Sequence, residues 1–105
     1  MKVVACVPDL MDRSKVSGAA PGTTFVASPG ALAEAAAGAD VVVVDLGRPG
    51  VLDVLPALAA AGVRVVGFGS HVDREVLDAA RTAGCTEVLP RSAFFRDLPA
   101  LLGGP

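Results

Sequence analysis

Four consecutive valines, Val41 to Val44, are followed directly by Asp45. A continuous β-branched run this short is typical of a strand that is covered on both faces, and such strands belong to parallel sheets. Open α/β folds place their functional sites at the carboxyl ends of the parallel strands. Asp45 lies at that end of the run, so it is the first candidate functional residue.

Strand-like and helix-like segments alternate five times along the chain. The predicted strands are Lys2–Val7, Thr24–Ala27, Val41–Leu46, Val63–Phe68 and Glu87–Leu89. The predicted helices are Asp9–Ala20, Gly30–Ala37, Gly50–Ala61, Asp73–Ala83 and Ala93–Leu102. Because crossovers between parallel strands are right-handed, this pattern predicts a three-layer α/β/α sandwich. Its five-stranded parallel sheet is expected in the flavodoxin-like order 2-1-3-4-5.

Length and composition limit the domain organisation and the function classes. The 105 residues are expected to form one domain, with a frayed tail at 103–105. A net charge of −2 with singly scattered Lys and Arg gives no reason to expect a nucleic-acid partner. No apolar segment is long enough for a signal peptide or a membrane span, so we expect no membrane contact. Cys6 and Cys85 are then expected to be reduced thiols in a cytoplasmic protein.

Polar and glycine residues follow most of the predicted strands. In a parallel sheet the carboxyl ends of the strands meet at one edge, where any site is expected. Besides Asp45, the residues that we expect to form this strand-end cleft are Asp9, Gly47, Gly69, Ser70, His71 and Arg91.

Two motifs with fixed spacing border that edge. Asp45 is followed four residues later by Pro49, and a helix that ends in Ala83-Gly84 is followed by a strand and Arg91. Through these motifs the chain resembles a response-regulator receiver domain over essentially its whole length. The resemblance implies that Asp45 occupies the phospho-acceptor position and that Arg91 occupies the position of the receiver lysine.

The other functional positions implied by the resemblance are altered. Val7 and Pro8 stand where receivers carry two acidic residues that bind Mg²⁺. Gly69 stands at the position of the receiver hydroxyl, and Val88 at that of the aromatic switch residue. Arg91 supplies a planar fork instead of the point charge of lysine. These differences favour a degenerate site over a phospho-accepting one.

Only Asp9 and Asp45 remain as weak candidate metal ligands, and one or two carboxylates make a poor site for a hard divalent cation. We therefore expect no cofactor, with Mg²⁺ relevant only if Asp45 is phosphorylated. Asp45 is instead expected to cap its own loop and to pair with Arg91 or Arg48 across the strand ends.

Three other signals have structural interpretations. Cys85 and Arg91-Ser92 have the spacing of cysteine phosphatases, but the intervening residues look like a strand and contain no glycine. Cys6 lies among apolar residues and is interpreted as a core thiol. The segment from Ser70 to Asp73, which includes the single histidine, is expected to cap the helix that follows.

The last predicted helix begins with two aromatic residues. Adjacent helical residues cannot both face the core, so one of the two is expected to be partly exposed. By the receiver resemblance, a partner or a second copy of the chain would dock on the fourth and fifth helices. The predicted interaction surface consists of Phe94, Phe95, Leu98, Leu101 and Leu102. Ordinary packing of this helix on the sheet is the alternative.

Three hypotheses about function follow. The first is an atypical receiver-like module that acts by contact with an unidentified protein partner, without phosphorylation and without enzymatic activity. The second is a true receiver that is phosphorylated at Asp45. The third is a small-ligand-binding or enzymatic flavodoxin-like domain that uses Ser70, His71 and Arg91 at the same edge.

Overall fold

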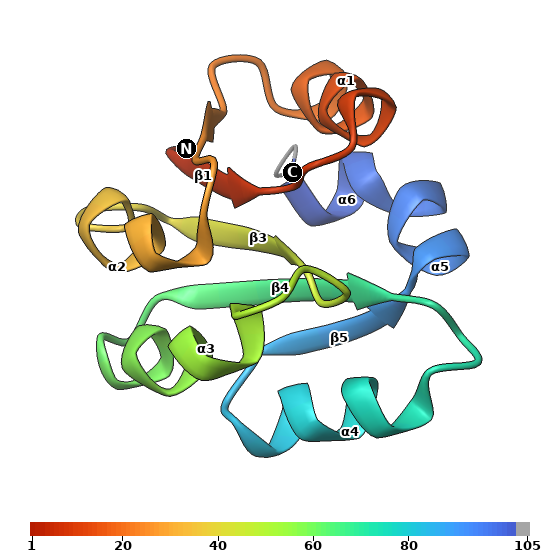
Figure 1. Cartoon of the computed structure of the whole chain (residues 1–105). Coiled ribbons are helices and arrows are strands. Elements are labelled where there is room, and N and C mark those ends of the chain that lie inside the picture. Colours follow the sequence, from red (N-terminus) through yellow and green to blue (C-terminus); the bar gives the residue numbers. More distant parts are fainter. Residues whose placement is uncertain (103–105) are drawn as a thin grey trace.

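The computed structural model describes residues 1–102 and shows five parallel strands in one sheet, with helices on both faces (Figure 1). The strands are β1 (Val3–Cys6), β2 (Thr24–Phe25), β3 (Val41–Asp45), β4 (Arg64–Gly69) and β5 (Glu87–Pro90). Their order in the sheet is β2-β1-β3-β4-β5, and every neighbouring pair is parallel. The predicted fold class and strand order are confirmed. The predicted tail at 103–105 lies outside the described residues.

Within residues 1–102 the helices are α1 (Leu10–Ala19), α2 (Leu32–Ala35), α3 (Val51–Ala60), α4 (Arg74–Thr82), α5 (Arg91–Arg96) and α6 (Leu98–Leu102). A 3-10 turn, η1 (Pro29–Ala31), precedes α2. The α3 helix runs through Pro56. No helix in this part of the chain is long and apolar enough to cross a membrane.

The predicted closing helix, Ala93–Leu102, begins two residues earlier than expected, at Arg91, and is divided in two. Asp97 lies between α5 and α6, and Pro99 is the second residue of α6. Proline has no backbone N–H, and its ring conflicts with the carbonyl group four residues earlier, here that of Phe95. The Asp97 N–H still donates to the Ala93 carbonyl oxygen at 3.0 Å, and the Leu101 N–H donates to that of Asp97 at 3.0 Å.

Alternate residues of β1 and β3 enter two hydrophobic layers. One layer contains Val42 and Val44 and packs against leucines of α2, α3 and α4. The other contains Val41 and Val43 and packs against α1, α5 and α6. All four valines are fully buried, which confirms that this strand is covered on both faces.

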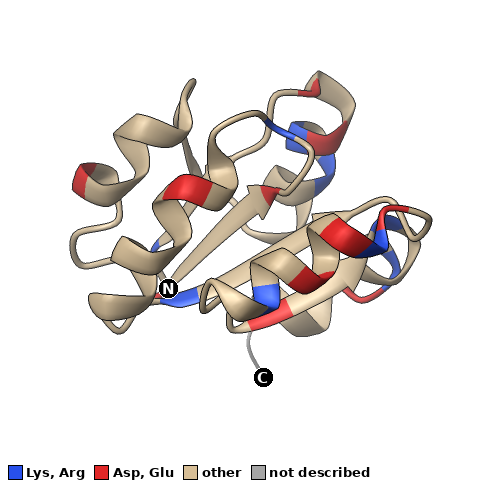
Figure 2. Ribbon diagram, turned by 60° about the horizontal axis from the view of Figure 1, so that its bottom comes forward, with Lys and Arg blue, Asp and Glu red and all other residues tan. Residues whose placement is uncertain are grey.

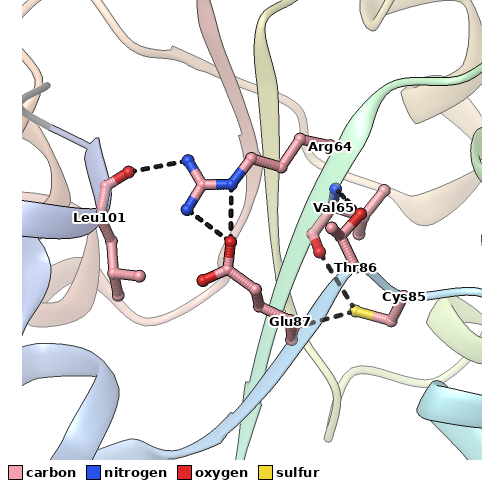
Figure 3. Close-up of polar contacts among 6 residues, drawn as sticks. All are labelled: Arg64, Val65, Cys85, Thr86, Glu87 and Leu101. Atoms are coloured by element: carbon pink, nitrogen blue, oxygen red, sulfur yellow. Dashed lines mark hydrogen bonds and ion pairs between the residues drawn. The ribbon is translucent and has the colours of Figure 1, made fainter.

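The amino end of the sheet is held by polar contacts of Arg64 (Figure 3). Its Nε donates to Glu87 Oε1 at 2.7 Å, and its Nη1 donates to the Leu101 carbonyl oxygen at 3.0 Å. The Val65 N–H donates to Thr86 Oγ1 at 2.9 Å in the same region. These contacts join β4, β5 and α6 at the edge opposite to the carboxyl ends of the strands.

Candidate functional site

Asp45 is the last residue of β3 and is half-buried at the carboxyl edge of the sheet. Its Oδ1 accepts a hydrogen bond from the Gly47 N–H at 2.9 Å. A Cβ atom at position 47 would lie only 3.3 Å from the same oxygen, so the loop fits a glycine there. The expectation that Asp45 caps its own loop is confirmed.

The expected pairing of Asp45 with Arg91 or Arg48 is wrong. Arg91 Nη2 donates to both carboxylate oxygens of Asp12, at 2.8 Å and 3.0 Å. Arg48 Nη2 donates to the Ala27 carbonyl oxygen at 3.1 Å. Charge-assisted hydrogen bonds of this kind are among the stronger ones in proteins, so Arg91 is oriented toward α1 instead of toward β3.

Asp12 is the functional-site residue that the sequence analysis missed. It is the only buried charged residue in the described part of the chain, with 3% of its surface exposed. One signal could have identified it, because Asp12 lies four residues before the buried Val16 and therefore shares its face of the helix.

Aromatic rings hold the Arg91 guanidinium group in place. Its Cζ lies 5.3 Å from the ring centroid of Phe68 and 5.2 Å from that of Phe95. Phe68 is itself stacked on Phe94, with ring centroids 4.5 Å apart. Guanidinium groups are attracted to aromatic faces, so these rings and Asp12 together fix the position of Arg91.

The residues at the end of β1 do not fit a magnesium ion. Val7 is completely buried in the core, and Pro8 has no oxygen in its side chain. Asp9 Oδ1 accepts the N–H groups of Met11 at 2.9 Å and Asp12 at 3.0 Å, which confirms Asp9 as the N-cap of α1. Among residues 1–102, no three His, Cys, Asp or Glu side chains lie close enough together to hold a metal ion. A hard cation needs several oxygen ligands, and this edge does not gather them.

Gly69, at the position of the receiver hydroxyl, is covered by core side chains. A Cβ atom there would lie 3.2 Å from Leu77 Cδ2 and 3.6 Å from Leu46 Cβ. At Gly67, two residues earlier on the same face of β4, it would lie 2.8 Å from Leu46 Cδ2. The space above this end of β4 is therefore filled by Leu46 and Leu77, and a hydroxyl side chain does not fit without a shift.

In the described part of the chain, no hydrogen bond joins the exposed loop between β4 and α4 to Arg91, which bonds to Asp12. Ser70 Oγ accepts only a long hydrogen bond, 3.4 Å, from the Val72 N–H. Asp73 is the N-cap by position, but its side chain caps nothing, so the expected capping by Ser70 to Asp73 is wrong for that carboxylate. His71 borders a hollow of about 190 Å³ on α4, whose lining residues are His71, Arg74, Leu77, Asp78 and Arg81.

Both cysteines are buried free thiols, as expected. Burial is the main cause that raises the pKa of the Cys6 thiol, against smaller lowering effects of Arg48 and Arg13. Burial also raises the pKa of Cys85, whose Sγ lies 3.3 Å from the Glu87 carbonyl oxygen. Neither environment favours a thiolate nucleophile.

The predicted interaction surface is wrong for Phe94 of α5 and for Leu98 and Leu102 of α6. Their side chains are buried in the hydrophobic core on this face of the sheet. Their helices pack directly on β4 and against α1, which leaves these side chains no free surface. Phe95 and Leu101 are half-buried at the border of the same cluster.

Large apolar side chains are exposed elsewhere. Leu10 and Met11, in the first turn of α1, are 75% and 73% exposed, and Val72 in the β4–α4 loop is 74% exposed. Pro8, two residues before the start of α1, is also exposed. We refer to Pro8, Leu10 and Met11 as the α1 apolar surface.

The strand order and the helices on both faces are those of response-regulator receiver domains. The signal receiver domain of NarL from Mycobacterium tuberculosis matches 95% of this chain and 90% of its own, with a TM-score of 0.77 and 18% identity. The phosphorylated cyanobacterial phytochrome response regulator RcpA matches 95% of this chain and 89% of its own (TM-score 0.77, 13% identity). The isolated REC domain of RcsB from Salmonella enterica serovar Typhimurium matches 95% and 83% (TM-score 0.73, 13% identity).

The sequence itself matches no protein-family model and no curated protein. The structural likeness therefore confirms the receiver resemblance at the level of the fold.

Proposed function

We propose that this chain is a receiver-like signalling module that acts through protein–protein contact, without magnesium-dependent phosphorylation of Asp45 and without enzymatic activity. The main supporting observation is the ion pair between Arg91 and the buried Asp12. Because Asp12 and two aromatic rings already hold the guanidinium group, it is not directed at a phosphoryl group on Asp45.

The chemistry of the edge supports the same proposal. Phosphoryl transfer to a carboxylate relies on a metal ion and fixed cations to neutralise the charge that develops in the transition state. In this chain, Val7 and Pro8 occupy the two positions at which receivers carry acidic residues, and the side chain of Asp9 caps a helix. The alternative hypothesis, a phospho-accepting receiver, is supported mainly by Asp45 and its spacing to Pro49.

We place the partner contact on the α1 apolar surface. Exposed large apolar side chains that lie next to one another are characteristic of protein contact sites. Leu10 and Met11 are adjacent and about three-quarters exposed, whereas the other apolar residues of α1 face the core or its border. Figure 2 shows Lys and Arg segments interspersed with Asp and Glu segments, a distribution that fits a protein partner better than a nucleic acid.

A homodimer through α4 and the α5–α6 segment remains a prediction, and Phe95 and Leu101 are its partly exposed apolar residues. Sedimentation of the wild-type chain over a range of concentrations tests it, with the double variant Phe95→Ser/Leu101→Ser as comparison. The two buried free thiols fit a reducing compartment, which is why a cytoplasmic location stays part of the proposal.

Intact-mass measurement after incubation with Mg²⁺ and a small phosphodonor tests the absence of phosphorylation. We expect no phosphoryl adduct under conditions in which an ordinary receiver domain is fully modified. An adduct that appears in the wild-type chain and is lost in Asp45→Asn would overturn this part of the proposal.

A second experiment tests the contact surface. The Leu10→Ser/Met11→Ser variant should keep the circular dichroism spectrum of the wild type and lose crosslinking to its partner in the source cell. Ser14→Ala/Ser17→Ala, on exposed positions of the same helix, is the matched control and should retain the crosslink. Equal crosslinking by both variants would place the contact elsewhere.

A further inference from the structure

Two arginine side chains at the carboxyl edge of the sheet have no carboxylate partner among residues 1–102. Arg13 belongs to α1, and Arg48 belongs to the loop between β3 and α3. The ion pairs in this part of the chain involve Arg64, Arg81, Arg91 and Arg96. Arg13 and Arg48 are nevertheless half-buried, which distinguishes them from arginines that simply extend into water.

Backbone carbonyl groups of adjacent chain segments hold these two arginines. Arg13 Nε donates to the Val7 carbonyl oxygen, and Arg48 Nη2 donates to that of Ala27 at 3.1 Å. In the register of β1 and β2, Ala5 is opposite Phe25, and the Val26 N–H still donates to the Ala5 carbonyl oxygen at 2.9 Å. Val7 and Ala27 each lie two residues beyond this pair along the chain, just past the carboxyl ends of β1 and β2. Both guanidinium groups are thus anchored next to the end of β1.

Most of the hydrogen-bonding capacity of these groups remains unused. A guanidinium group carries five N–H donors, and each of the two arginines uses one on the backbone. Arg48 Nε is buried and has no hydrogen-bond acceptor in the described part of the chain. A buried donor without an acceptor is destabilising, and this feature distinguishes Arg48 from an arginine whose donors all face water.

The charged groups near the end of β1 affect the pKa of the Cys6 thiol. Burial raises the pKa of Cys6, Arg48 and Arg13 lower it, and Asp45 has the smallest effect, a raising one. Arg48 and Arg13 each affect the pKa of this thiol more than Asp45 does. Among the carboxylates of this region, Asp12 is paired with Arg91, and Asp45 and Asp9 each use one oxygen to accept backbone N–H groups.

We infer that Arg13 and Arg48 form a binding site for a phosphate-type oxyanion at the carboxyl ends of β1 and β2. The planar fork of arginine matches the oxygens of phosphate, and two forks fixed by backbone carbonyls are pre-organised for it. The bound group is held and not transferred, so no covalent bond forms or breaks. This inference is independent of the proposed contact function and of the phosphorylation state of Asp45.

An NMR titration tests the inference. Inorganic phosphate is added to the ¹⁵N-labelled chain at constant ionic strength with chloride as the balancing anion. We expect saturable shifts of the Arg13 and Arg48 Nε–H signals and of the Gly47 and Arg48 amides. A nucleoside monophosphate in a second titration tells whether the site prefers a free or a nucleotide-borne phosphate, and saturable binding of either at these signals supports the site.

Matched variants locate the binding. Arg48→Gln should weaken phosphate binding about tenfold, because a hydrogen bond to a charged group is lost. Arg13→Gln should act in the same direction and serves if Arg48→Gln does not fold. Arg74→Gln, an exposed arginine on α4, should bind as the wild type does. Shifts that grow linearly without saturation, or equal weakening in Arg74→Gln and Arg48→Gln, would overturn the inference.

Discussion

At the scale of single residues, the pair of Asp12 and Arg91 determines how the candidate site is organised. Asp12 is almost fully buried, whereas 44% of the Arg91 side chain is exposed. Removal of a charge from water is costly, and that cost is offset only while the partner is present. The pair is therefore weak evidence for net stability, but each member depends strongly on the other.

Arg91→Met should lower the free energy of unfolding by about 1–3 kcal/mol, less than for a fully buried pair because one partner is partly screened by water. Arg96→Met is the control, since its pair with Asp97 is on the surface, and it should change little. Urea unfolding measures both. The double variant Asp12→Leu/Arg91→Met should recover most of the loss, and an unaltered unfolding midpoint in Arg91→Met would contradict this account.

We expect the thiols of Cys6 and Cys85 to cause a loss of stability at alkaline pH. Burial raises the pKa of Cys6 and of Cys85 in the folded chain above the ordinary value of 9.0. A raised pKa means that the folded state holds the proton more tightly. The stability that the protonated thiols contribute is therefore fully present below pH 9.0. It is lost as the pH rises through the pKa values of the two thiols in the folded state. The chain contains no tyrosine and only two lysines, Lys2 and Lys15.

Urea unfolding at neutral and at alkaline pH checks this prediction. The Cys6→Ala/Cys85→Ala variant should show a smaller decrease in the free energy of unfolding between the two conditions than the wild type. If the variant retains the full decrease, the two thiols do not cause it.

At the scale of elements, two glycines can be compared, one in a crowded position of a strand and one in an open position of a helix. A Cβ atom at Gly67 of β4 would lie 2.8 Å from Leu46 Cδ2 and 3.1 Å from Cys85 Sγ, whereas one at Gly18 of α1 meets nothing within 4 Å. Gly67→Ala should destabilise the fold by about 1–3 kcal/mol through overpacking. Gly18→Ala should stabilise it by about 0.5–1 kcal/mol through helix propensity. Thermal unfolding gives both signs, and a stabilising Gly67→Ala would show that Leu46 does not occupy this space.

Elements were predictable from the sequence wherever the cause is local. The valine run correctly predicted β3, and Asp9 correctly predicted the start of α1, because both signals act over a few residues. The break at Asp97 also had a local cause, Pro99, whose effect the sequence analysis did not apply.

The side-chain contacts of the candidate site are not determined by neighbouring residues in the sequence. Arg91 and Asp12 are separated by 79 residues, and nothing near either residue indicates the other. Asp45 and Arg48 were expected to seek charged partners, yet they bind a backbone N–H and a backbone carbonyl group of their surroundings. Side-chain partners across a sheet edge depend on tertiary packing, which periodicity does not encode.

At the scale of the whole molecule, stability should be independent of magnesium. A ligand that binds only the folded state raises stability by an amount that grows with its concentration over the dissociation constant. Because Val7 and Pro8 leave this edge without an oxygen cluster, we expect the same Tm with millimolar Mg²⁺ and with a chelator. Differential scanning calorimetry measures it. A saturable rise in Tm that disappears in Asp45→Asn would favour the phospho-accepting alternative.

The long separation between Asp12 and Arg91 also bears on the kinetics of the fold. A contact that joins the first helix to the fifth can close only after most of the sheet is in place, since loop closure across 79 residues is entropically costly. Contacts that form after the folding barrier slow unfolding and leave the folding rate unchanged. In stopped-flow experiments Arg91→Met should therefore unfold faster and refold at the wild-type rate. The pair then contributes to how long each native molecule persists and not to how quickly it forms.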